Sequence, residues 1–121
     1  MARVVIAEDD VDTRALMRAA LRPLDLEIHE VGTGLELLER IATAGPFDLI
    51  ITDLMMPHID GVRVIAMLRN AGLVTPVLMV TAYPPDDGPA AEWLGQVRLL
   101  RKPFGLVALR EAASALIPEL R

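Results

Sequence analysis

Polar side chains that could carry chemistry stand directly after short apolar runs of the sequence. Glu8 and Asp9 follow the first run, Asp53 follows the third, Thr81 ends the fourth and Lys102 comes shortly after the fifth. If these runs are parallel strands, their carboxyl ends meet at one edge of a sheet, which is where the sites of such sheets lie. The spacing therefore predicts that side chains far apart in the sequence converge in one crevice.

A pocket with several carboxylates needs a cation, because two carboxylates about 4 Å apart repel each other by roughly 4 kcal/mol at an effective dielectric constant of about 20. Hard carboxylate oxygens suit Mg²⁺, which binds one or two protein carboxylates together with waters and phosphate oxygens. Asp53 could then be the nucleophile that forms an acyl phosphate, with Lys102 as a fixed positive charge and Thr81 as a hydroxyl donor. The residue types predict Mg²⁺-assisted phosphoryl transfer to an aspartate.

Each of these residues also has an ordinary structural interpretation. The acidic run at residues 8–10 could be a solvated loop with a helix cap, and Asp53 could cap a helix or a turn. Thr81 is a good strand former, and a lysine before a proline, as in Lys102-Pro103, does not by itself indicate a function. Their common position after successive strands favours a shared site over these separate interpretations.

The elements that would position these residues are five strand–helix units. Short apolar runs predict buried strands, and apolar residues at helical spacing predict the helices between them. Alternating strands and helices favour a doubly wound α/β fold, with a parallel sheet covered on both faces. The predicted strands cover residues 4–7, 26–31, 49–52, 77–80 and 97–100, and the apolar helix positions fall within 16–21, 35–41, 64–68, 90–94 and 106–117.

The composition predicts one domain over residues 1–121, with an aliphatic core and strands buried on both faces, since 53% of residues are hydrophobic and only 3% aromatic. The chain has no cysteine, which excludes disulfides and thiolate metal sites. Its net charge of −5 argues against direct nucleic-acid binding, which needs clustered lysine and arginine. Its apolar runs are too short for a membrane span or a signal segment, so a cytoplasmic location is expected.

Four separated motifs resemble the receiver domain of two-component response regulators, the CheY-like family. The resemblance covers nearly the whole chain and implies a five-stranded sheet in the order 2-1-3-4-5. It also implies a cis bond before Pro103, which X–Pro bonds tolerate at low cost. The motifs are VVIAEDD at 4–10, ITDLMMPHIDG at 51–61, VTA at 80–82 and KPF at 102–104.

The resemblance also implies roles for the site residues. Asp53 would be the phosphoacceptor, Thr81 the hydroxyl that binds the phosphoryl group and Lys102 its ion-pairing partner. The domain would assist its own phosphorylation and dephosphorylation without being an enzyme in the ordinary sense. The Mg²⁺ ligands would be Glu8, Asp9, Asp53 and the backbone carbonyl of Met55.

The partners implied by the resemblance are proteins. A histidine kinase or phosphotransfer protein would donate the phosphoryl group. A downstream protein or an output domain would read the resulting conformational change. The resemblance implies no direct contact with nucleic acid and none with a membrane.

Two features depart from the family pattern. Leu99 stands three positions before the lysine, where the family usually has an aromatic residue that rotates inward on activation. Pro84, Pro85 and Pro89 restrict the backbone after Thr81, so the fourth helix is expected to be short, shifted or poorly ordered. This helix belongs to a face that commonly forms dimers in the family, and the sequence leaves the oligomeric state open.

These departures keep two alternatives open. A phosphorylation-independent interaction module would retain the fold, and Leu99 favours it, whereas the intact Asp53 and Lys102 weigh against it. A Mg²⁺-dependent phosphatase that works through a phosphoaspartate would usually need a second acid close after the nucleophile, where Leu54 and Met55 stand. Mg²⁺ binding and acylation of Asp53 would distinguish a phosphorylated receiver from the interaction module, and turnover of a phosphomonoester would favour the phosphatase.

Overall fold

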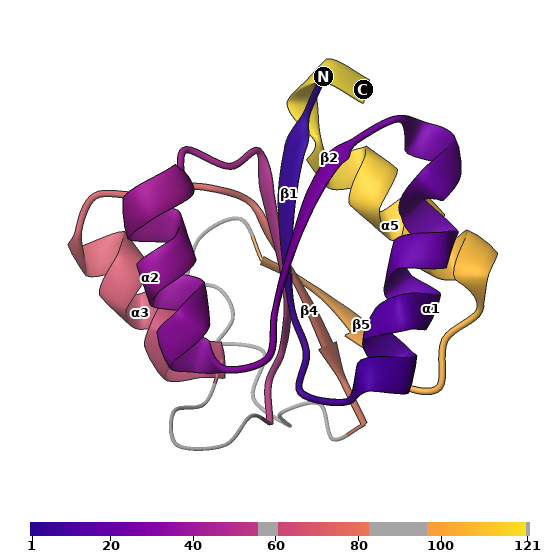
Figure 1. Ribbon diagram of the computed structural model, residues 1–121, viewed down its shortest axis with the longest axis horizontal. Helices are drawn as coiled ribbons and strands as arrows, with labels where there is room; N and C mark the ends of the chain where they lie inside the picture. The colour runs from indigo at the N-terminus through magenta and orange to yellow at the C-terminus, as the bar shows by residue number, and fades with distance from the viewer. Residues whose placement is uncertain (56–60, 83–96, 121) are drawn as a thin grey trace.

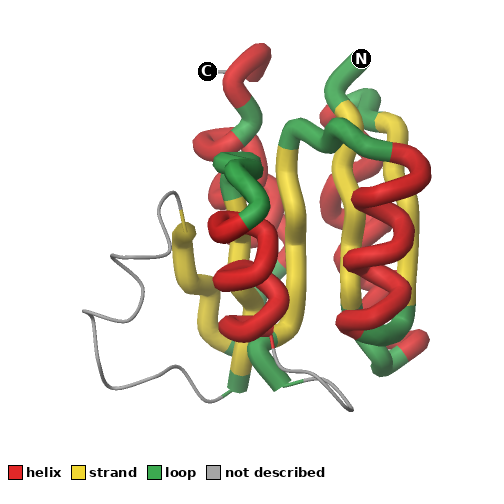
Figure 2. The backbone as a smooth tube through the Cα atoms, turned by 90° about the vertical axis from the view of Figure 1, so that its left-hand side faces the viewer, coloured by secondary structure: helices red, strands yellow, loops and turns green. Residues whose placement is uncertain are grey.

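The computed structural model describes residues 1–55, 61–82 and 97–120 of the chain. Five parallel strands form one sheet in the order β2-β1-β3-β4-β5, as expected (Figure 1). The tube view shows the strands as one layer between helices (Figure 2). The strands are β1 (Arg3–Ala7), β2 (Glu27–Val31), β3 (Leu49–Asp53), β4 (Val77–Thr81) and β5 (Val97–Arg101).

Helices cover both faces of the sheet in the described parts of the chain. α1 and α5 lie on one face, and α2 and α3 lie on the other (Figure 1). The short helix predicted within 90–94 and the preceding Pro84, Pro85 and Pro89 lie outside the described residues. The helices are α1 (Val11–Leu21), α2 (Gly34–Ala44), α3 (Gly61–Asn70) and α5 (Leu106–Leu116), with short 3-10 turns at Arg22–Leu24 and Pro118–Leu120.

The core is divided by the sheet into two aliphatic layers. Along β1, Val4 and Ile6 pack toward α1 and α5, while Val5 and Ala7 pack toward α2 and α3. This alternation follows from the two-residue period of a strand. The central strands β1, β3 and β4 are almost entirely buried, whereas three of the five residues of the edge strand β5 are exposed.

Local signals in the sequence explain where the helices begin and end. Asp10 caps α1, because its Oδ2 accepts a hydrogen bond of 3.0 Å from the Thr13 backbone N–H. Pro23 lies in the 3-10 turn that follows α1, because a proline has no backbone N–H and cannot continue the helix. Gly72 has a φ of +85°, and the Leu73 N–H bonds the carbonyl of Leu68 at 3.0 Å just beyond α3.

Two apolar residues at the predicted helical spacing are exposed instead of packed on the sheet. Leu16 in α1 is 53% exposed and Leu35 in α2 is 60% exposed, although both lie at the predicted apolar spacing. The buried line of α2 instead runs through Gly34 and Leu37, with Ile41 partly buried. Helical periodicity identifies an apolar stripe, and packing against the sheet decides which side of that stripe is covered.

Two peptide bonds before proline are cis in the described residues. The Lys102–Pro103 bond is cis, as expected, and the Gly45–Pro46 bond is a second one that was not expected. No helix in the described parts of the chain has the length and apolar character needed to span a membrane.

Candidate functional site

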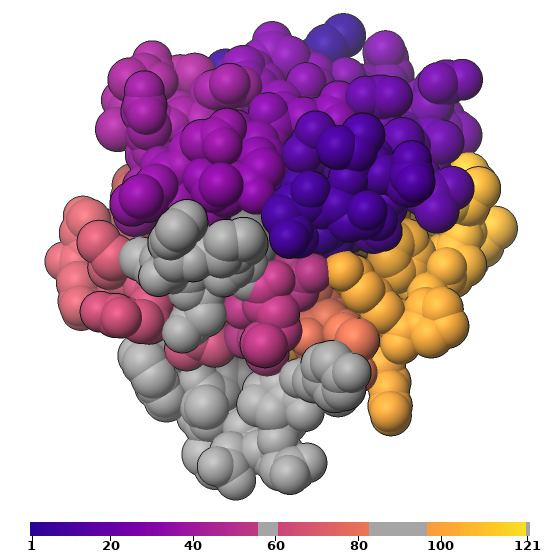
Figure 3. Space-filling view, turned by 60° about the horizontal axis from the view of Figure 1, so that its bottom comes forward, coloured from indigo at the N-terminus to yellow at the C-terminus, as the bar shows by residue number. Residues whose placement is uncertain are grey.

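The predicted site residues meet at the carboxyl edge of the sheet. Parallel pairing puts Ala7 opposite Thr52 and Thr81 opposite Arg101, so the strands end at similar levels. Figure 3 shows this edge, where segments from the beginning, the middle and the end of the chain lie side by side. The convergence predicted for residues at four strand ends is therefore present.

An acidic cluster forms the centre of the site. Carboxylate oxygens of Glu8, Asp9 and Asp53 lie within 4.8 Å of one another. Glu8 is fully buried and Asp53 is 5% exposed, whereas Asp9 is exposed to solvent. The cluster therefore combines two sheltered carboxylates with a third at its open side.

Lys102 joins the two buried acids. Its Nζ donates to Glu8 Oε1 at 2.7 Å and to Asp53 Oδ2 at 2.7 Å. Its backbone N–H donates to the Thr81 carbonyl at 2.8 Å, which continues the pairing of β4 with β5 beyond the strand end. Three carboxylates and one ammonium leave an excess of negative charge, so an oxygen-only donor set of this kind fits a hard divalent cation.

The backbone around Asp53 is held by close contacts. The Met55 N–H donates to Asp53 Oδ1 at 2.9 Å, and the Gly61 N–H donates to the Leu54 carbonyl at 3.0 Å. A Cβ on Gly61 would lie 2.6 Å from the Asp53 carbonyl oxygen. Only glycine allows α3 to begin so close to the end of β3 without a shift of the backbone.

Thr81 and Met55 flank this centre differently. Thr81 is fully buried at the end of β4, one position beyond Val80, the register partner of Asp53. The Met55 side chain is 60% exposed. Residues 56–60 of the motif that contains Asp53 lie outside the described part of the chain.

Burial and pairing shift the pKa values of two groups. Burial raises the pKa of the Glu8 carboxyl above its ordinary 4.5, although hydrogen bonds from Lys102 and the Asp10 backbone partly oppose the change. Burial alone would lower the pKa of Lys102, but its hydrogen bonds to Asp53 and Glu8 raise that pKa above its ordinary 10.5. Lys102 is therefore a permanent cation at neutral pH, and Glu8 ionises less readily than a surface glutamate.

A family model described as the response regulator receiver domain matches residues 4–114. The chain belongs to this family. Receiver domains of two-component systems are signalling modules rather than classical enzymes. The match and the contacts of Lys102 with both buried acids give no support to the alternative of a phosphorylation-independent interaction module.

Curated relatives of this receiver domain are longer response regulators. The chain is 36% identical over 120 residues to the transcriptional regulatory protein CiaR of Streptococcus pneumoniae, covering 97% of this chain and 52% of that protein. It is 33% identical over 116 residues to the response regulator MprA of Mycobacterium ulcerans, covering 95% of this chain and 50% of that protein. The chain thus spans about half the length of these two relatives.

Solved structures with the same fold include other receiver proteins. The chemotaxis response regulator CheY4 of Vibrio cholerae aligns with a TM-score of 0.85 at 27% identity, covering 96% of this chain and 98% of that one. The response regulator TrrA of Thermotoga maritima, solved in complex with Mg²⁺-BeF, aligns with a TM-score of 0.83 at 27% identity, covering 96% and 99%. The strand order 2-1-3-4-5 is thus the order of a receiver domain.

One residue near the acidic cluster of the receiver domain was missed at the level of sequence. The charge and position of Arg14 are typical of the solvated face of a helix, but its Nη1 donates to the backbone carbonyl of Glu8 at 2.8 Å. The receiver domain has several arginines on helices, and their spacing does not distinguish Arg14 from the others. The contact depends on how α1 lies over the end of β1, which a linear pattern does not encode.

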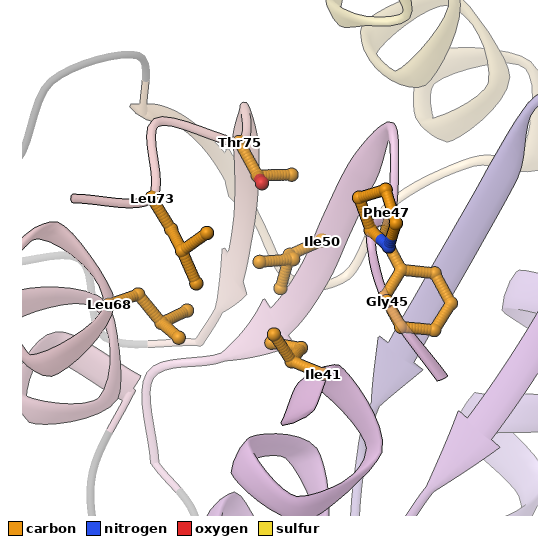
Figure 4. Close-up of a pocket in the computed structure, with 8 residues that line it drawn as sticks. Ile41, Gly45, Phe47, Ile50, Leu68, Leu73 and Thr75 are labelled. Carbon is orange, nitrogen blue, oxygen red and sulfur yellow. The ribbon is translucent and has the colours of Figure 1, made fainter. Parts of the chain in front are cut away.

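A separate apolar hollow lies at the opposite end of the sheet, between α2 and α3 (Figure 4). Its volume is about 290 Å³, and Thr75 is the one polar side chain in its lining. It contains none of the predicted site residues. The lining consists of Ile41, Gly45, Pro46, Phe47, Ile50, Leu68, Leu73 and Thr75.

Proposed function

We propose that this receiver domain, spanning residues 1–121, accepts a phosphoryl group on Asp53 in a Mg²⁺-dependent reaction. A histidine kinase or phosphotransfer protein would be the donor, and a downstream protein or an output domain would read the product. The observation that carries the proposal is the position of Asp53, which shares Lys102 with Glu8 inside the acidic cluster.

The Asp53 carboxylate is prepared as a nucleophile by the groups around it. The Met55 N–H binds Oδ1 and Lys102 binds Oδ2, so the carboxylate plane is fixed before any donor arrives. One carboxylate oxygen forms the new P–O bond while the bond between phosphorus and the donor nitrogen breaks, and that nitrogen keeps the electron pair. Phosphoryl transfer needs mainly such positioning together with charge neutralisation.

The acidic cluster would hold the metal ion. Glu8, Asp9, Asp53 and the backbone carbonyl of Met55 would be its protein ligands. When bound, Mg²⁺ supplies positive charge for the phosphoryl oxygens.

Lys102 and Thr81 would complete the environment of the phosphoryl group. After transfer, the Lys102 ammonium can exchange its contact with Asp53 for one with a phosphoryl oxygen, and the Thr81 hydroxyl can donate to another. The same groups would orient water during hydrolysis of the acyl phosphate, so the domain would assist both its phosphorylation and its dephosphorylation. The exposed Met55 side chain would tune access to the phosphoryl group.

The signal would be the change in charge and hydrogen bonding at this edge. A phosphoryl group adds nearly two negative charges and strong acceptor oxygens. These would draw Thr81 and Lys102 toward the end of β3, which would change the surface at the ends of β4 and β5. A partner that binds one of the two arrangements more tightly would read the phosphorylated state.

Intact-protein mass spectrometry after incubation with acetyl phosphate and Mg²⁺ tests the proposal. The wild type should gain the mass of one phosphoryl group, and the Asp53→Asn variant should gain none. Chelation of the metal should abolish the gain in the wild type. No gain in the wild type at a Mg²⁺ concentration that saturates the site would refute phosphoacceptor function.

A further inference from the structure

Arg14 connects the acidic cluster to two elements that contribute no ligand. From the second turn of α1 its Nη1 donates to the Glu8 carbonyl at 2.8 Å, and its Nε lies 3.4 Å from Oε1 of Glu30 on β2. The side chains of Arg14 and Glu30 are 22% and 25% exposed, so the ion pair is partly sheltered from water. One guanidinium therefore holds the loop after β1 against α1 and β2 together.

The carbonyl that Arg14 binds belongs to the peptide between the first two predicted metal ligands. The Glu8 side chain is held by Lys102 and the Glu8 N–H donates to the Val31 carbonyl at 3.1 Å. Among the described contacts, that of Arg14 is the one that reaches the Glu8 carbonyl. It fixes the plane of the Glu8–Asp9 peptide, and that plane sets the direction in which the Asp9 carboxylate leaves the backbone.

A neighbouring arginine provides a natural comparison. Arg18 lies one helical turn further along α1, and its Nη1 pairs with Oε2 of the same Glu30 at 2.7 Å. Its side chain is 50% exposed, and within the described residues it makes no hydrogen bond or ion pair with the loop after β1. Arg18 thus shares the charge and the partner of Arg14 without its contact with Glu8.

We propose that Arg14 is a positioning residue for metal binding: it orients the Glu8–Asp9 peptide so that Asp9 meets the cation together with Glu8 and Asp53. The inference rests on the proposed function, because it takes the acidic cluster to be a Mg²⁺ site. Glu30 anchors the guanidinium so that it stays on the carbonyl.

Charge and position predict opposite outcomes when Arg14 is replaced. A positive charge near a cluster of carboxylates opposes a divalent cation, so removing the charge alone strengthens Mg²⁺ binding. Removing an orienting contact weakens it, because the Asp9 carboxylate must then be ordered when the metal binds. The sign of the change in affinity therefore separates the two roles.

The experiment compares the Mg²⁺ affinities of wild type, Arg14→Met and Arg18→Met by titration followed through backbone amide NMR shifts. Arg14→Met should bind Mg²⁺ more weakly by a factor on the order of ten, as with other outer contacts of metal ligands. Arg18→Met should bind it like the wild type. Thermal melting in EDTA establishes that each variant is folded.

A charge-preserving pair of variants repeats the comparison if Arg14→Met does not fold. Arg14→Lys and Arg18→Lys both keep the positive charge, but a lysine at position 14 lacks the guanidinium that contacts the Glu8 carbonyl and Glu30 together. Weaker Mg²⁺ binding in the first supports the positioning role, and equal binding overturns it.

A measurement without metal gives a second readout. The Asp10 N–H donates to Glu8 Oε2 at 3.2 Å, so its exchange with solvent reports on the order of the loop. In EDTA this amide should exchange faster in Arg14→Met than in Arg18→Met, and equal rates overturn the inference. Failure of the wild type to bind Mg²⁺ would refute the proposed function itself, whereas wild-type binding with an unchanged or tighter Arg14→Met refutes only the role of Arg14.

Discussion

Lys102 is the side chain on which the metal-free site depends, because it binds both buried carboxylates. Replacing it by methionine leaves the Glu8 and Asp53 oxygens without this partner, so Lys102→Met should lose about 1–3 kcal/mol of stability in EDTA. Saturating Mg²⁺ should reduce that loss, since the ion supplies positive charge to the same oxygens. Urea denaturation with EDTA and with Mg²⁺ measures both quantities.

The neighbouring exposed cation Arg101 provides the control for that prediction. Arg101→Met makes the same change in charge without removing a partner of the acids. An equal loss of stability for Lys102→Met in EDTA and in Mg²⁺ would contradict the view that the lysine and the metal neutralise the same charge.

Glu8 gives the domain a characteristic dependence on pH. Because burial raises the folded-state pKa of Glu8 above its ordinary 4.5, the folded protein binds this proton more tightly than the unfolded chain. Stability must then fall as pH rises from about 4.5 through the folded-state pKa. Glu8→Gln does not ionise, so in EDTA its stability relative to the wild type should increase across that interval and stay constant above it.

Denaturation midpoints at a series of pH values in EDTA measure this difference. The exposed Glu111 on α5 serves as the control, because Glu111→Gln removes the same charge from the surface. If the stability of Glu8→Gln relative to the wild type fell as pH rises, ionisation of the buried carboxyl would not destabilise the folded protein.

The junction between β3 and α3 is the element contact that most constrains Asp53. A methyl group on Gly61 would lie 2.6 Å from the Asp53 carbonyl oxygen and 3.2 Å from Leu54 Cα. Gly61→Ala should therefore shift the start of α3, cost about 1–3 kcal/mol of stability and slow phosphorylation of Asp53. Chemical denaturation and the rate of mass gain with acetyl phosphate measure the two effects.

Gly105 offers a matched substitution at another helix start. It caps α5 with a φ of −85°, and a Cβ there meets no atom within 4 Å. Gly105→Ala should cost about 1 kcal/mol or less, because alanine is a poorer N-cap than glycine, and it should leave phosphorylation unchanged. Equal behaviour of the two alanine variants would show that the approach of Gly61 to β3 is unimportant.

Metal binding should stabilise the domain as a unit, because the acids come from two adjacent central strands of the sheet. At a free Mg²⁺ concentration 100 times the dissociation constant, the gain in unfolding free energy should be about 2.7 kcal/mol. Asp9→Asn should gain less at the same concentration. Asp12→Asn removes an exposed carboxylate on α1, so this variant should gain as much unfolding free energy as the wild type.

Thermal or urea unfolding at increasing Mg²⁺ measures that gain for all three proteins. If Asp9→Asn were stabilised as strongly as the wild type, Asp9 would not be a ligand. The test is independent of any phosphoryl donor.

The sequence predicts the strands and most of the helices of the domain, because buried strands and helical stripes leave short-range patterns. Helix ends at Asp10, Pro23 and Gly72 follow from local stereochemistry. Periodicity does not predict the strand order, which was implied by the resemblance to the receiver family. The exposure of Leu16 and Leu35 could not be predicted, because it depends on how each helix packs on the sheet.

The candidate site could be predicted as a set of residues but not as a network of contacts. The strand ends bring Glu8, Asp53 and Lys102 to one edge, so their proximity follows from topology. The binding of both acids by one ammonium depends on the level at which β5 ends relative to the other strands. The contact of Arg14 depends on the placement of α1, which no local signal specifies.

The ion pairs of Lys102 with Glu8 and Asp53 span 94 and 49 residues of the chain. Lys102 follows the edge strand β5, which among the described strands pairs with β4 alone. The two contacts therefore require three successive strand pairings, β1 with β3, β3 with β4 and β4 with β5. A strand with one neighbour and mostly exposed residues is the kind of element that opens first in local unfolding. When β5 detaches, the acids stay on β1 and β3 while the ammonium leaves. Under the proposed function, the ability to carry a phosphoryl group would then depend on complete folding: with β5 unpaired, the acids could still bind a metal ion, but the Lys102 ammonium would be absent from the phosphoryl group.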